Sequence, residues 1–270
     1  MPKTNVNGID IYYEIGGQGE PLILIMGHGA GHRGWRFHVG AFKKYYKVIT
    51  FDSRSLGKTG GRGEPYTIRT LADDTIALMD HLGLEKAHVL GASLGGMIAQ
   101  EVAINYPQRV MKLVLVSTTP GGWEVSETHP EVLRVMGVKD DPNKVDYRSL
   151  DVGKWISVLI SLSFNKRLYR MLCLPVAKLY MKSVAGSEGL IGQLEAVAGH
   201  DTRDRLHLIE APTLVMTGTE DRLVAPQHSE VIASGIPSAK LVKVEGGSHA
   251  FLVEMRRRFR QEALDFLRDC

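Results

Sequence analysis

One serine stands between two glycines where a strand is expected to turn into a helix. The segment Gly91-Ala92-Ser93-Leu94-Gly95 follows a short apolar run that ends at Leu90, and a helical pattern over 94–105 follows it. Such a turn forces the serine into a strained backbone conformation, and a side chain at either glycine would clash with a neighbouring strand or helix. Ser93 is therefore the candidate nucleophile of a covalent mechanism.

A serine hydroxyl is a poor nucleophile unless a base takes its proton, so a histidine and an acid are needed downstream. Asp221 follows the predicted strand Leu214–Met216, and His249 follows the predicted strand Leu241–Val244. Both lie at the carboxyl ends of strands, where ligands bind in open α/β sheets. We expect His249 to act as general base and Asp221 to orient it; Glu220 is the alternative acid.

Acyl transfer also needs backbone N–H groups aimed at the negative charge that develops on the substrate oxygen. The N–H of Leu94, at the start of the helix behind Ser93, is the first candidate. The second is expected in the glycine-rich loop over 26–31. Strand register favours the N–H of His28, and that of Ala30 is the alternative.

Strand and helix signals alternate along most of the chain, which predicts an α/β fold: a mostly parallel sheet with helices on both faces. A hairpin turn at Asn7-Gly8 precedes them. The apolar runs suit strands that are buried on both faces; they lie at 22–26, 48–51, 88–90, 113–116, 214–216 and 241–244. The helical patterns cover about 67–82, 94–105, 226–234 and 254–268.

The alternation breaks after the sixth strand, between about 119 and 208. Apolar residues recur there at helical spacing, and basic residues interrupt them, which argues against a membrane span, so no membrane partner is expected. We predict a hydrolytic core over 1–118 and 209–270 and a helical lid over 119–208. Trp155, Leu159 and Leu162 are the lid residues expected to contact an acyl chain.

The composition is that of an ordinary soluble globular protein, with 270 residues, 44% hydrophobic, 23% charged and a net charge of +3. Charges are spread along the chain, and acidic residues accompany the arginine run at 256–260, so no nucleic-acid partner is expected. The N-terminus lacks a signal pattern, and the two cysteines lack metal-type spacing, so a reducing cytoplasm is the expected location.

These motifs resemble those of the α/β-hydrolase family over nearly the whole chain. The segment over 51–59 resembles the family's D-x-R-G-x-G-x-S loop, although Ser55 replaces the glycine and Thr59 the serine. The resemblance implies an eight-stranded, mostly parallel sheet whose second strand is reversed. A serine at position 93 makes the aspartate-nucleophile branches, haloalkane dehalogenases and epoxide hydrolases, poor candidates.

Within the family the chain is similar to small carboxylesterases and acyl-homoserine lactone hydrolases. The resemblance implies cleavage of a small ester or lactone through an acyl-enzyme on Ser93, without a metal or organic cofactor. Carbon–carbon bond hydrolases and cofactor-free perhydrolases remain alternatives on the same three residues. A non-catalytic ligand receptor is a further alternative, because a fold alone does not prove activity.

A dinucleotide-binding oxidoreductase is the main rival class. The sequence from Gly29 to Gly34 reads G-x-G-x-x-G directly after a strand, and Asp52 ends the next strand, where a ribose-binding acid would lie. The bulky Trp35, Arg36 and Phe37 do not suit the tightly packed helix of that motif. This rival also leaves Ser93, Asp221 and His249 without a role.

Overall fold

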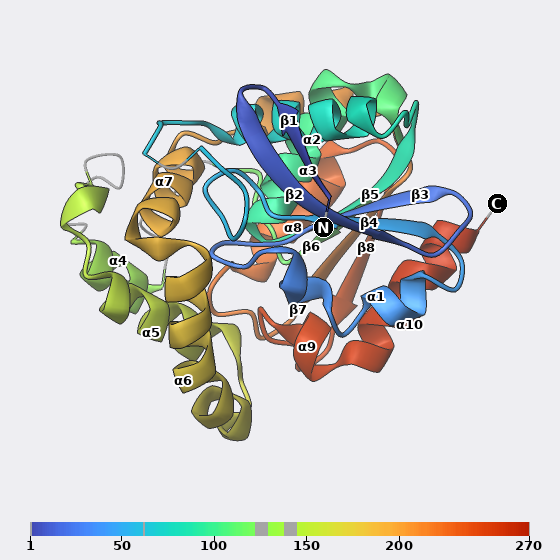
Figure 1. The fold of residues 1–270 in the computed structure, drawn as a ribbon. Coiled ribbons are helices and arrows are strands. Elements are labelled where there is room, and N and C mark those ends of the chain that lie inside the picture. The colour runs from blue at the N-terminus through green and yellow to red at the C-terminus, as the bar shows by residue number, and fades with distance from the viewer. Residues whose placement is uncertain (1, 62, 122–128, 138–144, 270) are drawn as a thin grey trace.

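The fold is given by a computed structural model, which describes residues 2–61, 63–121, 129–137 and 145–269 (Figure 1). Eight strands form one sheet in the order β1-β2-β4-β3-β5-β6-β7-β8. Their bounds are β1 (Lys3–Val6), β2 (Ile9–Gly16), β3 (Pro21–Ile25), β4 (Lys47–Phe51), β5 (Ala87–Ala92), β6 (Val110–Val116), β7 (Thr213–Gly218) and β8 (Ala239–Val244).

The strands are parallel from β4 to β8, and β2 runs antiparallel to both of its neighbours. This confirms the mostly parallel sheet with a reversed second strand. The hairpin between β1 and β2 turns at Asn7 and Gly8, which both have positive φ. Because β3 to β7 are parallel, their carboxyl ends lie along one edge, and loops from that edge can meet at one place.

Helices cover both faces of the sheet (Figure 1). One face packs against α2 (Ile68–His81), α3 (Leu94–Asn105) and α8 (Pro226–Gly235). The other packs against α1 (Val39–Phe42), α9 (Phe251–Glu254) and α10 (Arg256–Arg268). Side chains of β3 alternate between the two cores, so an uninterrupted apolar strand is the physical consequence of burial on both faces.

Most predicted elements agree with the structure to within a few residues, and the C-terminal helix is the main difference. The pattern over 254–268 forms the end of α9 and the separate helix α10, with a break at Met255, whose φ of −120° and ψ of 44° leave the helical region. The strand β6 also begins at Val110, three residues before the apolar run that was predicted to start at Leu113.

In the described part of the chain between β6 and β7, four α-helices gather at one end of the molecule (Figure 1). They are α4 (Pro130–Met136), α5 (Val152–Ser163), α6 (Arg167–Val184) and α7 (Gly186–Ala198). The boundaries 1–118, 119–208 and 209–270 and the lid itself stay predictions. Within the described ranges, no helix is both long enough and apolar enough to traverse a bilayer.

The structure does not support the dinucleotide-binding interpretation of the loop over 29–34. A short 3-10 helix, His32–Trp35, follows β3 in place of a long helix, and Trp35 is fully buried. The carboxylate of Asp52 is also buried, and it accepts hydrogen bonds from the backbone N–H groups of His32 and Lys58. The Asp52 carboxylate therefore connects the loops that contain His32 and Lys58.

Candidate active site

Ser93 occupies a sharp turn between β5 and α3. Its φ of 54° and ψ of −123° lie outside the regions that side chains with a Cβ prefer. Hydrogen bonds to β6 and the residues after it help to hold this conformation: the Ser93 N–H donates to the Val116 carbonyl, and its carbonyl accepts from the Thr118 hydroxyl, both at 2.8 Å. The neighbouring strand β6 thus helps to fix the position of the candidate nucleophile.

The glycines on either side allow the turn to pack closely. A Cβ at Gly91 would lie 2.2 Å from the carbonyl oxygen of Gly95, and one at Gly95 would lie 2.2 Å from that of Ile25 in β3. Both distances are far below van der Waals contact, so the turn needs glycine at both positions. Gly27 has a related role, since a Cβ there would lie 2.9 Å from the Cβ of Ser93.

Three side chains from distant parts of the sequence meet at this turn. The Nε2 atom of His249 lies 3.1 Å from the Oγ atom of Ser93, and its Nδ1 atom lies 2.8 Å from Oδ2 of Asp221. An ionised carboxylate can only accept, so we assign the ring proton to Nδ1 and leave Nε2 free to accept from the serine hydroxyl. The arrangement can abstract the serine proton.

The carboxylate of Asp221 is held from two sides. Its Oδ1 atom accepts hydrogen bonds from the backbone N–H groups of Leu223 and Val224, each at 2.9 Å, while Oδ2 faces His249. Glu220, the alternative acid, is directed elsewhere, because its Oε2 accepts from the Asn165 side chain at 2.8 Å. The geometry therefore favours Asp221 over Glu220 as the partner of His249.

The candidate oxyanion donors differ in whether their N–H groups are already used. The N–H of Ala30 donates to the Gly27 carbonyl at 3.2 Å, and that of Gly29 donates to Oε1 of Gln193 at 2.8 Å. In the part of the chain that the structure describes, the N–H groups of His28 and Leu94 have no acceptor. Of the two alternatives, His28 is the one free to bind an oxyanion.

The side chain of His28 contacts a helix that follows β6. Its Nε2 atom accepts a hydrogen bond from the Trp155 indole N–H in α5 at 3.0 Å, and the two rings meet edge to face. Desolvation lowers the pKa of His28 to about 4, so the ring is neutral near neutral pH and can accept this bond. Together with Gln193 in α7, Trp155 ties the loop over 26–31 to these helices.

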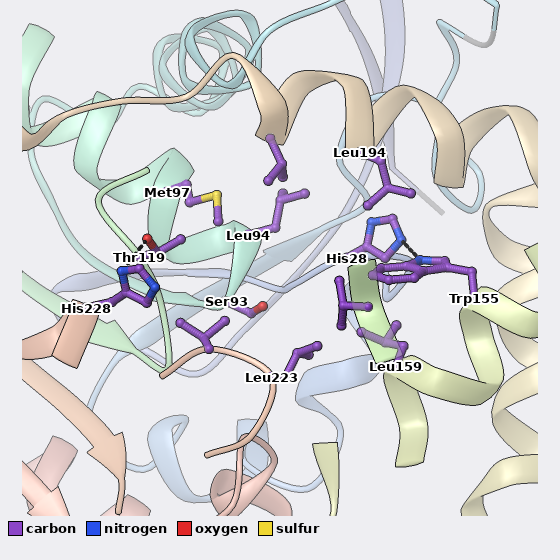
Figure 2. Close-up of a pocket in the computed structure, with 13 residues that line it drawn as sticks. His28, Ser93, Leu94, Met97, Thr119, Trp155, Leu159, Leu194, Leu223 and His228 are labelled. Atoms are coloured by element: carbon purple, nitrogen blue, oxygen red, sulfur yellow. Dashed lines mark hydrogen bonds between the residues drawn. The ribbon is translucent and has the colours of Figure 1, made fainter. Parts of the chain in front are cut away.

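Ser93 lies on the wall of a cavity of about 760 Å³, part of it open to solvent (Figure 2). Its lining is mainly apolar, and it extends from the hydrogen-bonded pair Thr119 and His228 to Trp155 and Leu159. A second cavity, of about 900 Å³, shares Ser93, His28 and Leu159 with the first and also contacts His249. The candidate nucleophile thus borders both of these mainly apolar cavities.

The predicted lid residues have different surroundings. Trp155 and Leu159 line the first cavity, whereas Leu162 is buried against Val132 and Met136 and lines neither cavity. Ile160 and Ser163, on a neighbouring face of α5, line the second cavity, so Leu162 is excluded by the face of the helix on which it lies.

Several lining residues were not anticipated from the sequence: Met97, Thr119, Val132, Leu194, Val197, Leu223, Val224 and His228. Met97, four residues after Ser93 on α3, could have been inferred from helical spacing. Most of the others come from separate segments that only the fold brings together. Among the described residues, no three His, Cys, Asp or Glu side chains lie close enough to hold a metal ion.

Comparison with known proteins agrees with this geometry. Residues 20–254 match the family described as alpha/beta hydrolase fold. The chain belongs to this family, and it is a hydrolase.

Individual relatives differ in the substrates that their names state. The chain is 30% identical to a protein of Azorhizobium caulinodans that carries the name carbamate hydrolase RutD, over 93% of this chain and 92% of the relative. It is 25% identical to the enol-lactonase from Burkholderia xenovorans, with a TM-score of 0.86 and coverage of 98% and 99%. It is 27% identical to Est816, an N-acyl homoserine lactone degrading enzyme, with a TM-score of 0.83 and coverage of 98% and 100%.

Proposed function

We propose that this hydrolase cleaves a small carboxylic ester or a lactone through an acyl-enzyme on Ser93. The hydroxyl oxygen of Ser93 attacks the carbonyl carbon while Nε2 of His249 accepts the proton. Asp221 keeps the ring oriented and stabilises the imidazolium that forms. The N–H groups of Leu94 and His28 bind the oxyanion.

In the rest of the reaction His249 acts first as an acid toward the leaving alcohol and then as a base toward water. His249 returns its proton to the alkoxy oxygen, so the bond between the carbonyl carbon and that oxygen breaks and the alcohol leaves. In a lactone the alcohol stays attached to the acyl group. A water molecule, deprotonated by His249, then attacks the acyl-enzyme and releases the acid and the free serine.

The observation that carries this proposal is that Ser93 borders two mainly apolar cavities. A substrate with apolar groups on both sides of its carbonyl would fill them, as an ester or an acylated lactone does. The helices α4 to α7 would act as a lid, because Trp155, Leu159 and Leu194 close the first cavity from that side. Lid contacts would then set the preferred acyl length.

A carbamate is the second candidate substrate, because a 30% identical relative carries that name. Its carbonyl would react at the same serine, but a small polar carbamate would leave most of the apolar cavity empty. Hydrolysis of p-nitrophenyl acyl esters, N-acyl homoserine lactones and p-nitrophenyl carbamate should be compared by their kcat/KM values. We expect kcat/KM to rise with acyl length for esters or lactones; a higher value for the carbamate would contradict the proposal.

A serine-reactive probe separates turnover from mere binding. A fluorophosphonate should label the purified protein at Ser93, and the Ser93→Ala variant should stay unlabelled. A protein that binds the esters but is neither labelled nor active would be a ligand receptor.

A further inference from the structure

The helix α6 carries an exposed row of large apolar side chains. The row consists of Leu168 (60% exposed), Met171 (60%), Leu172 (63%), Val176 (63%) and Leu179 (75%). These are five of the ten large hydrophobic residues that are exposed in the described part of the chain. Their spacing of mostly three or four residues places them on one face of the helix. Single exposed apolar residues are ordinary, but a contiguous row indicates a surface that binds something.

The opposite face of the same helix faces the candidate active site. Ala177, Tyr180 and Met181 line the cavity that also contains Ser93 and His249. The outward row is therefore not needed to complete the core of the molecule. It lies across one helix, about 10 Å in diameter, from the space in which a substrate would react.

The charges on α6 have one sign. The helix contains no aspartate or glutamate and has four basic residues: Arg167, Arg170, Lys178 and Lys182. Lys166 precedes the helix directly. Within the described residues, no ion pair involves Arg167, Arg170 or Lys178. Among the described residues, the apolar row is thus accompanied by cations that form no ion pair, although the Glu254 carboxylate accepts from the backbone N–H of Lys166 just before the helix.

Apolar residues beside unpaired lysines and arginines are typical of helices that lie in the plane of an anionic membrane surface. A second copy of the chain fits this face less well. A two-fold contact would place the cations of one α6 near those of the other, with no acid on either helix to offset them. The basic residues that argue against a membrane span are those expected of a helix lying on the surface.

We propose that α6 docks this protein on an anionic phospholipid bilayer. The apolar row would enter the boundary between headgroups and acyl chains, and Arg167 and Lys178, at one edge of the row, would contact lipid phosphates. The proposal concerns where the protein binds, so its test does not depend on which substrate the enzyme cleaves.

Vesicle co-sedimentation of the full chain tests the proposal. Vesicles of 30% phosphatidylglycerol in phosphatidylcholine should retain the protein at least tenfold better than pure phosphatidylcholine, and 0.5 M NaCl should remove most of this difference. The variant Leu172→Glu/Leu179→Glu should lose at least tenfold in binding while its activity on a soluble ester stays unchanged. The control Leu208→Glu/Val231→Glu alters two exposed apolar residues outside α6, 45% and 44% exposed, and should bind as the parent does.

Three outcomes would overturn the proposal. One is equal binding to both kinds of vesicle, and another is undiminished binding by the α6 variant. The third is a dimer in sedimentation velocity that Leu172→Glu/Leu179→Glu converts to monomer, because the row would then be the contact between two copies.

Discussion

The indole N–H of Trp155 in α5 donates a 3.0 Å hydrogen bond to Nε2 of His28, the residue whose backbone N–H is the candidate second oxyanion donor. One side chain from the segment between β6 and β7 therefore helps to position a backbone group in the loop that packs against Ser93. This contact predicts that the helices affect the chemistry as well as the choice of substrate.

Replacing Trp155 by Phe tests this contact. The change keeps a ring against His28 but removes the donor, and a desolvated nitrogen without a partner costs about 1–3 kcal/mol. We expect kcat for a short p-nitrophenyl ester to fall by up to about 100-fold, because a misplaced oxyanion donor binds the transition state poorly. Stopped assays and thermal unfolding measure the two effects.

Trp35→Phe is the matched control for Trp155→Phe. The indole N–H of Trp35 is buried and has no partner among the described residues, so its loss breaks no hydrogen bond. This variant should keep its kcat. An equal loss of kcat in both variants would mean that the His28 contact has no specific role.

Substitutions at 220 and 221 separate the two neighbouring acids. Asp221→Asn should lower kcat by about four orders of magnitude, since an amide can no longer hold His249 in the reactive tautomer. Glu220→Gln should change kcat less than about threefold, because Glu220 faces Asn165. Steady-state kinetics on one ester decide between them, and a large loss in Glu220→Gln alone would assign the acid to Glu220.

Variants at Ser93 separate catalysis from backbone strain. Ser93→Ala and Ser93→Gly should both lower kcat by about five orders of magnitude, since neither has a nucleophile. Glycine tolerates the φ of 54° that strains alanine, so the glycine variant should be about 1 kcal/mol more stable than the alanine variant. Urea unfolding gives this difference, and the reverse order of stabilities would argue against strain at the turn.

The stability of the protein should depend on pH through His38. Burial, with Arg260 and Arg256 nearby, lowers the pKa of His38 to about 4. Both ring nitrogens lack partners in the described structure, and the ring packs edge-on against Phe259. The unfolded chain takes up a proton below pH 6.5 while the folded ring stays neutral, so stability is lost as the pH falls from about 6.5 towards 4.

His38→Phe should remove this part of the acid sensitivity. Between pH 7 and pH 5, the parent should lose about 2 kcal/mol more unfolding free energy than the variant does. Urea titrations at the two pH values measure it. His200 has its pKa lowered to about 4 by the same cause and stays in both proteins, so some acid sensitivity should remain. Equal losses in parent and variant would exclude His38.

Much of this protein could be inferred from local patterns. Doubly buried strands must be apolar along their whole length, and a tight turn at Ser93 requires glycine at 91 and 95, so both leave strong traces in neighbouring residues. The order of Ser93, Asp221 and His249 at strand ends likewise pointed to one edge of the sheet.

The tertiary structure decided what short-range patterns do not encode. The choice of His28 over Ala30 depends on a hydrogen bond from Ala30 to Gly27, and the placing of Leu162 outside both cavities depends on which face of α5 packs in the cluster with Val132 and Met136. Helical spacing shows that apolar residues share one face of a helix. It does not tell whether that face lines a cavity, packs in a core or stays exposed as the row on α6 does. These differ only in what other parts of the chain lie opposite, and that is set by long-range packing.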